Sequence, residues 1–382
     1  MFGLRGLRPD REISGFETAF SEIAPSLVDR GHRVTIYCRA GAHSPSRRPA
    51  LESGVELIYT PSPGGKNFSA LTSTGFAVAH ALAKRTFDVW FFVNVGMGHH
   101  SALARLSGRP VVMNVDGLDW KRGKWGPVAR AYFYSAAHSA VRWCTTLITD
   151  AEAMREHYRE EFGRDSVMIP YGATIESSTA PELLAPFGVG RHEYYLIVSR
   201  LIPENTLESL LDGFRRSASR RRLLVVGAAT YQDDFQGRLR ALAASDERIR
   251  LVGLVHDQAV LKELWCNCYG YLHGHSVGGT NPALLRAMGY GACVLARDTV
   301  FNREVLGHAG DYFDNDPATV ARLIDELDTS PARAEQLRIE GRNRVRALYR
   351  WEDVASAYER VFIEAVERSG RRRLVQSMPV HR

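Results

Sequence analysis

The stretch GHSVGGTNPALLRAMGYG, residues 274–291, has the residue types and spacing of a turn that binds an anion. Asn281 is followed by Pro282, and these residue types favour the cap and the first residue of a helix. Backbone N–H groups ahead of such a helix are free to bind a phosphate or a sugar hydroxyl. The N–H groups that we expect to do so belong to Gly278, Gly279 and Thr280.

The helix predicted after this turn carries a cation and no carboxylate. Arg286 is its charged side chain, and no Asp or Glu occurs between Leu264 and Arg297. His275 comes just before the turn, where it either hydrogen-bonds a ligand or is an ordinary histidine at the end of a strand. A sugar-nucleotide site built on this turn would therefore have a positive charge on its helix.

A second candidate segment is VSRLIPEN, residues 198–205, where Arg200 follows a predicted strand. The planar guanidinium of arginine bonds two oxygen atoms at once, which suits a diphosphate. Glu204 and Asn205 come next, directly before a predicted helix. The alternative is a surface loop held by a salt bridge.

A third candidate segment is NVDGLDWKRGKWG, residues 114–126. Asp116 and Asp119 follow an apolar strand, and a carboxylate there can hydrogen-bond a substrate hydroxyl or remove its proton. Trp120 and Trp125 offer flat apolar faces to sugar rings. The alternative is a solvated loop, which two tryptophans disfavour.

The first loop, GLRGLRPDREISGFET at residues 3–18, has glycines that let backbone N–H groups approach a ligand. We expect Gly15, Glu17 and Thr18 to line a cleft between domains. The spacing is not GxGxxG, which disfavours a dinucleotide site. The alternative is a plain turn with a helix cap.

Short apolar strands alternate with amphipathic helices along the chain, and this pattern predicts parallel α/β layers. It repeats after residues 171–181. The expected fold class is α/β, with two Rossmann-like domains facing across a cleft, and ligands bind such sheets at the carboxyl ends of their strands. Only Met1 and Phe2 precede Gly3, so either most of the first strand is missing or translation starts upstream of this Met.

The composition is that of a folded protein of two ordinary domains, with 382 residues, 45% hydrophobic and 24% charged. No apolar run reaches the length of about eighteen residues that a spanning helix needs, and no signal peptide is recognised. The five cysteines do not indicate a disulfide framework. Cys266 and Cys268 are better explained as packing residues in a reducing cytoplasm than as metal ligands with His273 and His275.

The net charge is +6 and the isoelectric point is about 9.1. Basic triplets at Arg220–Arg222 and Arg371–Arg373 indicate attraction to phosphates or to an anionic membrane, and a solvated arginine-rich surface is an equal alternative. Nucleic acid is disfavoured as a partner, because basic and aromatic residues do not recur along one stripe.

In this order, GLRG…GFET, NVDGLDWKRGKWG, IPYGA, VSRLIPEN, HGHSVGGTNPALL and FNREVLGHAGDYF resemble the retaining GT-B glycosyltransferases. The resemblance covers nearly the whole chain and is to a family 4-like branch that includes bacterial rhamnosyltransferases. It implies an acceptor-binding domain at 1–172, a domain for a nucleotide-diphosphate sugar at 173–348, and a terminal helix and basic tail at 349–382 that crosses back to the first domain. It implies neither cofactor nor metal, so cationic and backbone groups must neutralise the leaving diphosphate.

The same resemblance implies roles for the residues above. Arg200 matches the basic ligand of the diphosphate, and Asp116 matches a polar position at the end of an acceptor-domain strand. Asn205 stands where many relatives have Lys. The other donor-binding residues would be His275, Gly278, Gly279, Thr280, Asn281 and Arg286, and the acceptor-binding residues would be Gly15, Glu17, Thr18, Asp119 and Trp120.

One departure from the family pattern concerns two glutamates, separated by seven residues, around the turn. The second typically binds the ribose hydroxyls, but here the two positions are Gly278 and Arg286. Three explanations remain open. The donor carries deoxyribose, which offers one hydroxyl fewer; Arg286 binds a phosphate instead; or the site has lost catalysis.

Together these features predict a retaining transferase that moves L-rhamnose or another 6-deoxyhexose from a dTDP-sugar to a hydroxyl group. The acceptor would be a glycan, a lipid-linked sugar or a natural product. The expected location is cytoplasmic, with peripheral contact at the inner face of an anionic membrane as one option. The alternatives are a non-catalytic auxiliary protein of the same fold and a GT-B sugar-nucleotide epimerase.

Overall fold

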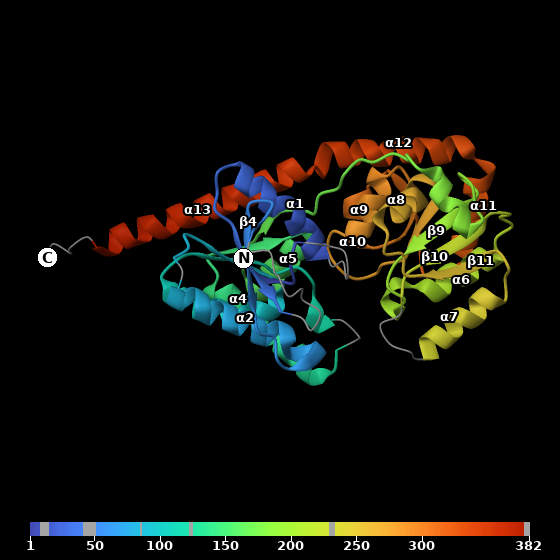
Figure 1. The fold of residues 1–382 in the computed structure, drawn as a ribbon. Coiled ribbons are helices and arrows are strands. Elements are labelled where there is room, and N and C mark those ends of the chain that lie inside the picture. Colours follow the sequence, from blue (N-terminus) through green and yellow to red (C-terminus); the bar gives the residue numbers. More distant parts are fainter. Residues whose placement is uncertain (8–14, 41–50, 85, 122–124, 229–233, 378–382) are drawn as a thin grey trace. The chain divides into compact units, whose positions relative to one another are not determined.

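The computed structural model of the chain describes all residues except 8–14, 41–50, 85, 122–124, 229–233 and 378–382 (Figure 1). The chain divides into two compact units. Unit 1 comprises residues 1–170 and 351–382, and unit 2 comprises residues 171–350. Each unit is a sheet of mainly parallel strands with helices packed on it.

Unit 1 contains a sheet with the strand order β3-β4-β2-β1-β5-β6-β7-β8, parallel except for the β3–β4 pair. A short strand, β1, occupies the centre, where Phe2 stacks on the rings of Tyr37, Trp90 and Phe92. Strands buried on both faces are continuous apolar runs, as in WFFV at 90–93. The strands are β1 (Phe2–Leu4), β2 (Thr35–Arg39), β3 (Leu51–Glu52), β4 (Val55–Thr60), β5 (Trp90–Val93), β6 (Val111–Asn114), β7 (Thr146–Thr149) and β8 (Val167–Met168).

Helices cover both faces of the unit 1 sheet. Figure 1 shows α2 (Gly65–Lys84) and α4 (Pro127–Trp143) on one side, and α1 (Gly15–Asp29) and α13 (Trp351–Ser377) on the other. α3 (Gly98–Ala104) packs against both α2 and α4, whereas α13 packs against α1. The remaining helices of the unit are α5 (Glu152–Phe162) and the short 3₁₀ turns η1 (Val95–Met97), η2 (Arg105–Ser107) and η3 (Asp119–Lys121).

Unit 2 contains a fully parallel sheet with the strand order β11-β10-β9-β12-β13-β14. The order runs outward in both directions from the neighbours β9 and β12, so the point between them is the topological switch point. The strands are β9 (Tyr194–Val198), β10 (Arg222–Val226), β11 (Ile249–Gly253), β12 (Gly270–His273), β13 (Cys293–Arg297) and β14 (Gly310–Phe313).

Most helices of unit 2 lie between these strands in the chain, whereas η4 precedes β9 and α11 and α12 follow β14. One apolar core packs α6 and α11 against the sheet. The helices of unit 2 are α6 (Leu207–Arg216), α7 (Asp234–Ala244), α8 (Gln258–Asn267), α9 (Pro282–Gly289), α10 (Val300–Leu306), α11 (Pro317–Thr329), α12 (Pro331–Leu348) and the 3₁₀ helices η4 (Pro181–Phe187) and η5 (Pro203–Asn205). The last strand of unit 1, β8, is short: Ile169 N–H still donates to the Thr149 carbonyl at 2.8 Å, and Pro170, which has no N–H to donate, follows directly.

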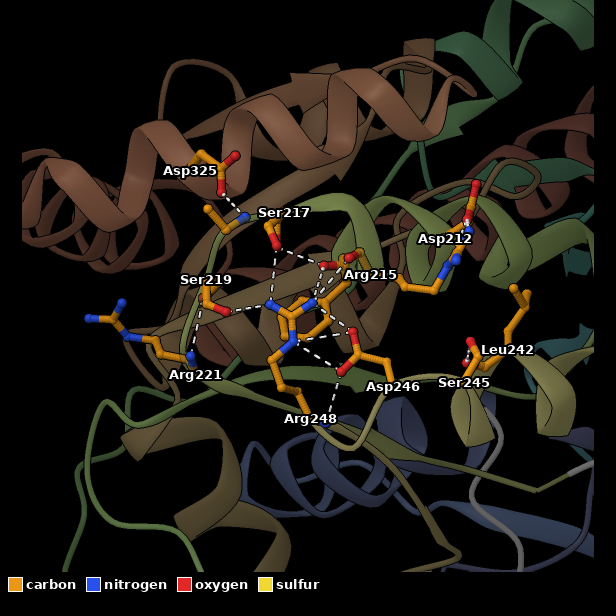
Figure 2. A network of polar contacts seen from close by, with 12 residues as sticks. Asp212, Arg215, Ser217, Ser219, Arg221, Leu242, Ser245, Asp246, Arg248 and Asp325 are labelled. Atoms are coloured by element: carbon orange, nitrogen blue, oxygen red, sulfur yellow. Dashed lines mark hydrogen bonds and ion pairs between the residues drawn. The ribbon is translucent and has the colours of Figure 1, made fainter.

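One arginine holds the carboxyl end of α6 (Figure 2). The guanidinium of Arg248 donates to the carbonyls of Phe214, Arg215 and Ser217 at 3.3, 3.1 and 3.1 Å, and also to that of Ser219. Asp246 accepts from the same guanidinium at 2.6 Å, which lowers the pKa of its carboxyl group. The last carbonyls of a helix have no partner within it, so this arginine satisfies them and fixes the helix that begins beside residue 206.

A buried glutamate hydrogen-bonds residues 178–180, near the start of unit 2. Glu263 of α8 accepts from Ser178 Oγ at 2.5 Å, from the backbone N–H groups of Thr179 and Ala180 at 2.8 and 3.0 Å, and from Asn267 at 2.8 Å. Burial alone would raise the pKa of this carboxyl, but the four hydrogen bonds outweigh it and the pKa lies below its ordinary value. Residues 178–180 are thereby pinned to α8.

All five cysteines are buried with free thiols, and burial raises the pKa of each one. Raised thiol pKa values are typical of packing residues rather than of nucleophiles or metal ligands.

Candidate functional site

The candidate donor site lies in unit 2 at the switch point between β9 and β12. The loop after β9 (residues 199–206) and the loop after β12 (residues 274–281) both leave the carboxyl edge of the sheet there. Open α/β sheets bind ligands at this place because the loops diverge and leave room. Most of the donor residues predicted from the sequence are in these two loops.

Hydrogen bonds tie these two loops together. Thr206 Oγ1 donates to the Gly274 carbonyl at 2.7 Å, and Ser276 donates to the Glu204 carbonyl through both N–H and Oγ, at 3.1 and 2.6 Å. The loops approach so closely that a Cβ on Gly274 would lie 2.2 Å from the Asn205 carbonyl oxygen. Only glycine fits there, so the residue type at 274 sets the distance between the loops.

The turn at 278–281 combines a glycine conformation with a capped helix start. Gly278 has a φ of 125°, which favours glycine. The Asn281 side chain accepts from Ala283 N–H at 2.9 Å and caps α9, and Pro282 is the first helical residue, so the predicted helix start is confirmed. Within the part of the chain that the structure describes, the N–H groups of Gly278 and Gly279 donate to no protein acceptor. Thr280 is buried beside them.

Arg200 and His275 come together at this site. Burial, and next the positive charge of Arg200, lower the pKa of His275 to about 3, so the imidazole is neutral at physiological pH. The ring of His275 stacks on that of His273 at 4.4 Å between centroids. A neutral histidine beside an exposed arginine can hydrogen-bond a ligand that the arginine attracts.

The side chain of Asn205 is buried and bonds the protein backbone, so it is not exposed to a ligand. It is buried, and its Nδ2 donates to the Arg200 carbonyl at 2.8 Å. The amide therefore shapes the loop that presents Arg200, and its effect on a donor would act through that loop.

The side chain of Arg286 packs against α8. Its guanidinium is 5.3 Å from the centroid of the Trp265 ring, within range of a cation–π contact. The two side chains line an open cavity of about 270 Å³ together with Lys262 and Tyr290, and with Gln258, Ala259 and Leu261. Sequence reasoning missed Lys262, since α8 was not recognised as the neighbour of α9. The spacing of residues 258, 261, 262 and 265 on one helical face was the available signal.

A second polar cluster lies in unit 1 at the carboxyl ends of β6 and β7. Asp116 is half-buried, and its N–H donates to Asn114 Oδ1 at 2.9 Å. Asn114 Nδ2 donates in turn to the hydroxyl of Tyr358 on α13 at 3.0 Å. Burial raises the pKa of the Tyr358 hydroxyl, and the negative charges of Asp150 and Asp116 raise it further. The hydrogen bond from Asn114 acts in the opposite direction and lowers this pKa.

Sequence reasoning identified Asp116 in this cluster and missed Asn114, Asp150 and Tyr358. Asp150 is buried directly after β7, and Asp116 is the second residue after the neighbouring strand β6. An acidic residue at the end of a predicted strand, TLITD, was a signal for it. The contact with Tyr358 joins residues 244 positions apart and had no local signal.

The tryptophans of the 114–126 segment are packed rather than open to a ligand. Trp120 is 9% exposed, with its ring against Tyr134, Tyr158 and Phe162 and stacked on His157. Trp125 donates its Nε1–H to Asp119 at 3.3 Å. Both rings anchor the segment, so the expectation that Trp120 presents a flat face to an acceptor sugar is not supported by its burial.

The first loop places Gly15, Glu17 and Thr18 in the first turn of α1. Glu17 is buried and accepts from the Arg5 N–H at 3.1 Å, and burial raises the pKa of its carboxyl group while Arg5 opposes the rise. Glu17 thus links α1 to the end of β1. Gly15 and Thr18 are half-buried beside it.

Among the residues that the structure describes, no cluster of three or more His, Cys, Asp and Glu side chains could hold a metal ion. Among the same residues, no helix combines the length and the apolar character needed to cross a membrane.

Comparison with solved structures now defines the fold. A sucrose-phosphate synthase from Thermosynechococcus elongatus superimposes with a TM-score of 0.76 at 17% identity, over 92% of this chain and 93% of that one. HepE of Anabaena, solved with UDP and glucose, gives 0.75 at 16% over 94% and 98%. A glycosyltransferase from Rickettsia africae gives 0.72 at 14% over 92% and 95%. The chain has the GT-B fold.

A sequence family also matches the first part of the chain. Residues 14–172 match the family described as glycosyl transferase 4-like domain. A search of curated proteins finds no significant match. The GT-B likeness at these low identities concerns the fold, and the domain match concerns unit 1, which holds the Asp116 cluster.

Proposed function

We propose that this protein is a glycosyltransferase that takes its sugar from a nucleotide-diphosphate donor. The observation that carries the proposal is the cradle of unit 2. Two loops joined at Thr206–Gly274 and Ser276–Glu204 hold the N–H groups of Gly278 and Gly279 at the start of a capped helix, beside Arg200. Such a site binds a diphosphate. The domain match of residues 14–172 and the GT-B likeness support a transferase.

The chemistry assigned to this site is stabilisation of the leaving diphosphate. Arg200 and the cradle N–H groups would carry the negative charge that develops as the glycosidic bond to the donor breaks. Neutral His275 would donate a hydrogen bond to the same donor. We propose that no metal takes part, because fixed cationic and backbone donors perform the neutralising role. We also propose that the configuration of the donor carbon is retained, as the resemblance to the retaining enzymes implies.

Unit 1 would bind the acceptor. Asp116 would orient the acceptor hydroxyl, and a phosphate oxygen of the leaving group would share the role of base. We propose that Glu17, in the first turn of α1, and Asp119 also contribute to acceptor binding in this unit. The acceptor that we propose is a glycan, a lipid-linked sugar or a natural product.

The donor that we propose is a dTDP-6-deoxyhexose such as dTDP-L-rhamnose. Helix α9 has no carboxylate to bind a ribose diol, and deoxyribose has only one of those two hydroxyls. A hydrogen bond to a charged group contributes about 1.5–3 kcal/mol, so the missing carboxylate costs a deoxyribose donor less than a ribose donor. The same missing carboxylate also favours a second function, that of a nucleotide-sugar-binding partner without catalysis.

The test is donor turnover by the full chain with dTDP-, UDP- and GDP-sugars, followed as release of the nucleoside diphosphate, with binding measured by calorimetry. We expect turnover to fall about a hundredfold in Arg200→Ala, as when one stabilising donor is removed. Arg346→Ala on α12 is the matched control, because this exposed arginine has Asn343 as its single hydrogen-bond partner among the residues that the structure describes. Binding without turnover of any donor would favour the non-catalytic function, and no binding at all would contradict the site.

A further inference from the structure

Helices α8 and α9 lie side by side in unit 2 (Figure 1), and residues of both line the open cavity of about 270 Å³. Lys262 and Arg286 are the cations that line it, and both side chains are half-buried. Its apolar wall includes the rings of Trp265 and Tyr290, which meet edge to face with centroids 5.9 Å apart. Small-molecule sites have volumes of about 300–1,000 Å³, so the cavity has the size for a small molecule rather than for a macromolecule.

The two cations of the α8–α9 cavity are not neutralised by the protein. Within the described part of the chain, neither Lys262 nor Arg286 forms an ion pair with a carboxylate. The carboxylates of the neighbouring helix are bonded elsewhere, because Asp257 caps the first turn of α8 and Glu263 is held by residues 178–180. Helix α9 contains no carboxylate. The cavity therefore has a positive charge that a bound anion would balance.

Several hydrogen-bond donors at this cavity also lack an acceptor. The guanidinium of Arg286 contacts the Trp265 ring at 5.3 Å and donates to none of the described residues. The ammonium of Lys262 donates to Thr179 Oγ1 at 2.9 Å and has further N–H groups to donate. Trp265 is 2% exposed, and its indole N–H has no acceptor among the residues that the structure describes. Such donors are rare in folded proteins, and gathered at one cavity they indicate a ligand rich in acceptor oxygens.

We propose that the α8–α9 cavity binds a phosphomonoester, that is, a phosphate joined through one oxygen to a small organic molecule. This group has a charge of about −1.5 to −2 at neutral pH and three strong acceptor oxygens, so it matches both the charge and the donors of Lys262 and Arg286. A carboxylate, or a phosphodiester of nucleic acid, has a single negative charge and would leave one cation unbalanced. The rings of Trp265 and Tyr290 would pack against the organic part.

The phosphomonoester has two sources that the chemistry of the cavity alone does not separate. Arg286 follows the helix cap Asn281 by five residues, which is about 7.5 Å along α9, so a donor nucleotide at the cradle extends to the cavity. The phosphate is then carried either by that nucleotide or by a separate small molecule. The site itself does not depend on transferase activity.

The test is calorimetric titration of the full chain with phenyl phosphate, benzoate and phenol, which share an aromatic ring and differ in charge. We expect phenyl phosphate to bind about tenfold more tightly than benzoate, and phenol not to bind. A hydrogen bond to a charged group contributes about tenfold or more to affinity. Lys262→Gln and Arg286→Gln should therefore each weaken the binding of phenyl phosphate about tenfold or more.

Arg346→Gln on α12 is the matched control, because it removes one exposed positive charge of the same unit. We expect this variant to bind phenyl phosphate like the unaltered protein, and thermal unfolding checks that all variants are folded. Arg200→Ala should also retain this binding, so a failure of the donor cradle and a failure of the cavity are distinguishable.

Titration in the presence of UDP separates the two sources. If UDP displaces phenyl phosphate, the phosphate that the cavity binds is carried by the donor nucleotide; if both bind together, it belongs to a separate molecule. The proposal is overturned if benzoate binds as tightly as phenyl phosphate, or if the Lys262 and Arg286 variants bind like Arg346→Gln. It is also overturned if Arg200→Ala abolishes the binding of phenyl phosphate while the cavity variants retain it.

Discussion

Gly274→Ala tests whether the two loops of the cradle touch as described. A Cβ at residue 274 would lie 2.2 Å from the Asn205 carbonyl oxygen, 2.7 Å from Thr206 Oγ1 and 2.8 Å from a methyl carbon of Leu210. The first of these is backbone and cannot rotate away. The loops must therefore separate by about 1 Å before ordinary van der Waals contact is restored.

The expected cost has two parts. Forcing an extra carbon into a packed site costs about 1–3 kcal/mol. Losing the hydrogen bond from Thr206 to the Gly274 carbonyl adds about 1 kcal/mol. The free energy of unfolding of unit 2 should fall by about 2–4 kcal/mol, which for a domain of this size lowers Tm by roughly 4–16 °C. A displacement of about 1 Å in a site that positions reactants should lower turnover about a hundredfold.

Calorimetric unfolding and donor turnover, measured on the same preparation, provide the assay. Gly237→Ala is the control, because Gly237 is an exposed residue of α7 whose added Cβ would meet nothing within 4 Å. That substitution should stabilise the protein by about 0.4–1 kcal/mol. If Gly274→Ala unfolds and turns over donor like the unaltered protein, the loops do not contact each other in solution and the argument for the cradle fails.

Three further substitutions probe the surroundings of the cradle. Arg248→Lys should destabilise unit 2 by about 2 kcal/mol in urea unfolding, because an ammonium cannot reach all four carbonyls in and after the last turn of α6 that the guanidinium bonds; an unchanged midpoint would contradict that role. Glu263→Gln should cost about 2 kcal/mol at neutral pH. The native pKa of Glu263 is lowered, so this difference should shrink as pH falls below about 4, and a pH-independent difference would show that charge is not involved. Arg286→Glu should shift the ratio of Kd values about tenfold toward UDP-sugars, and equal loss of both donors would mean that Arg286 itself binds the donor.

Much of the cradle could be predicted from the sequence because its signals are local. The Asn281–Pro282 cap, Gly278 in a left-handed conformation and Arg200 after a strand are all properties of a few consecutive residues. The alternation of strands and helices likewise predicted two parallel-sheet units, and the topology confirms them. Local signals suffice here because caps and turns depend on interactions within about four residues.

What the sequence could not provide depends on contacts between distant segments. Trp120 in a polar loop was interpreted as a sugar contact, but its ring is buried by side chains of α4 and α5. The closeness of Gly274 to Asn205 and the bond from Asn114 to Tyr358 join residues that no periodicity relates. In each case tertiary packing decides whether a polar or aromatic residue faces solvent or another element.

Arg286 is a residue for which the sequence and the structure give complementary information. From the sequence it is a cation in place of an expected carboxylate, which leaves open whether it binds the donor. The structure places its guanidinium over Trp265 and lines one cavity with it and Lys262. Lys262 donates through Nζ to Thr179 Oγ1 at 2.9 Å, so both side chains are cations at the edge of the same cavity. Such a cavity favours an anion over a neutral ribose. We therefore predict that Arg286, where the family pattern has a carboxylate, makes this cavity prefer a negatively charged group, and the Arg286→Glu measurement tests this.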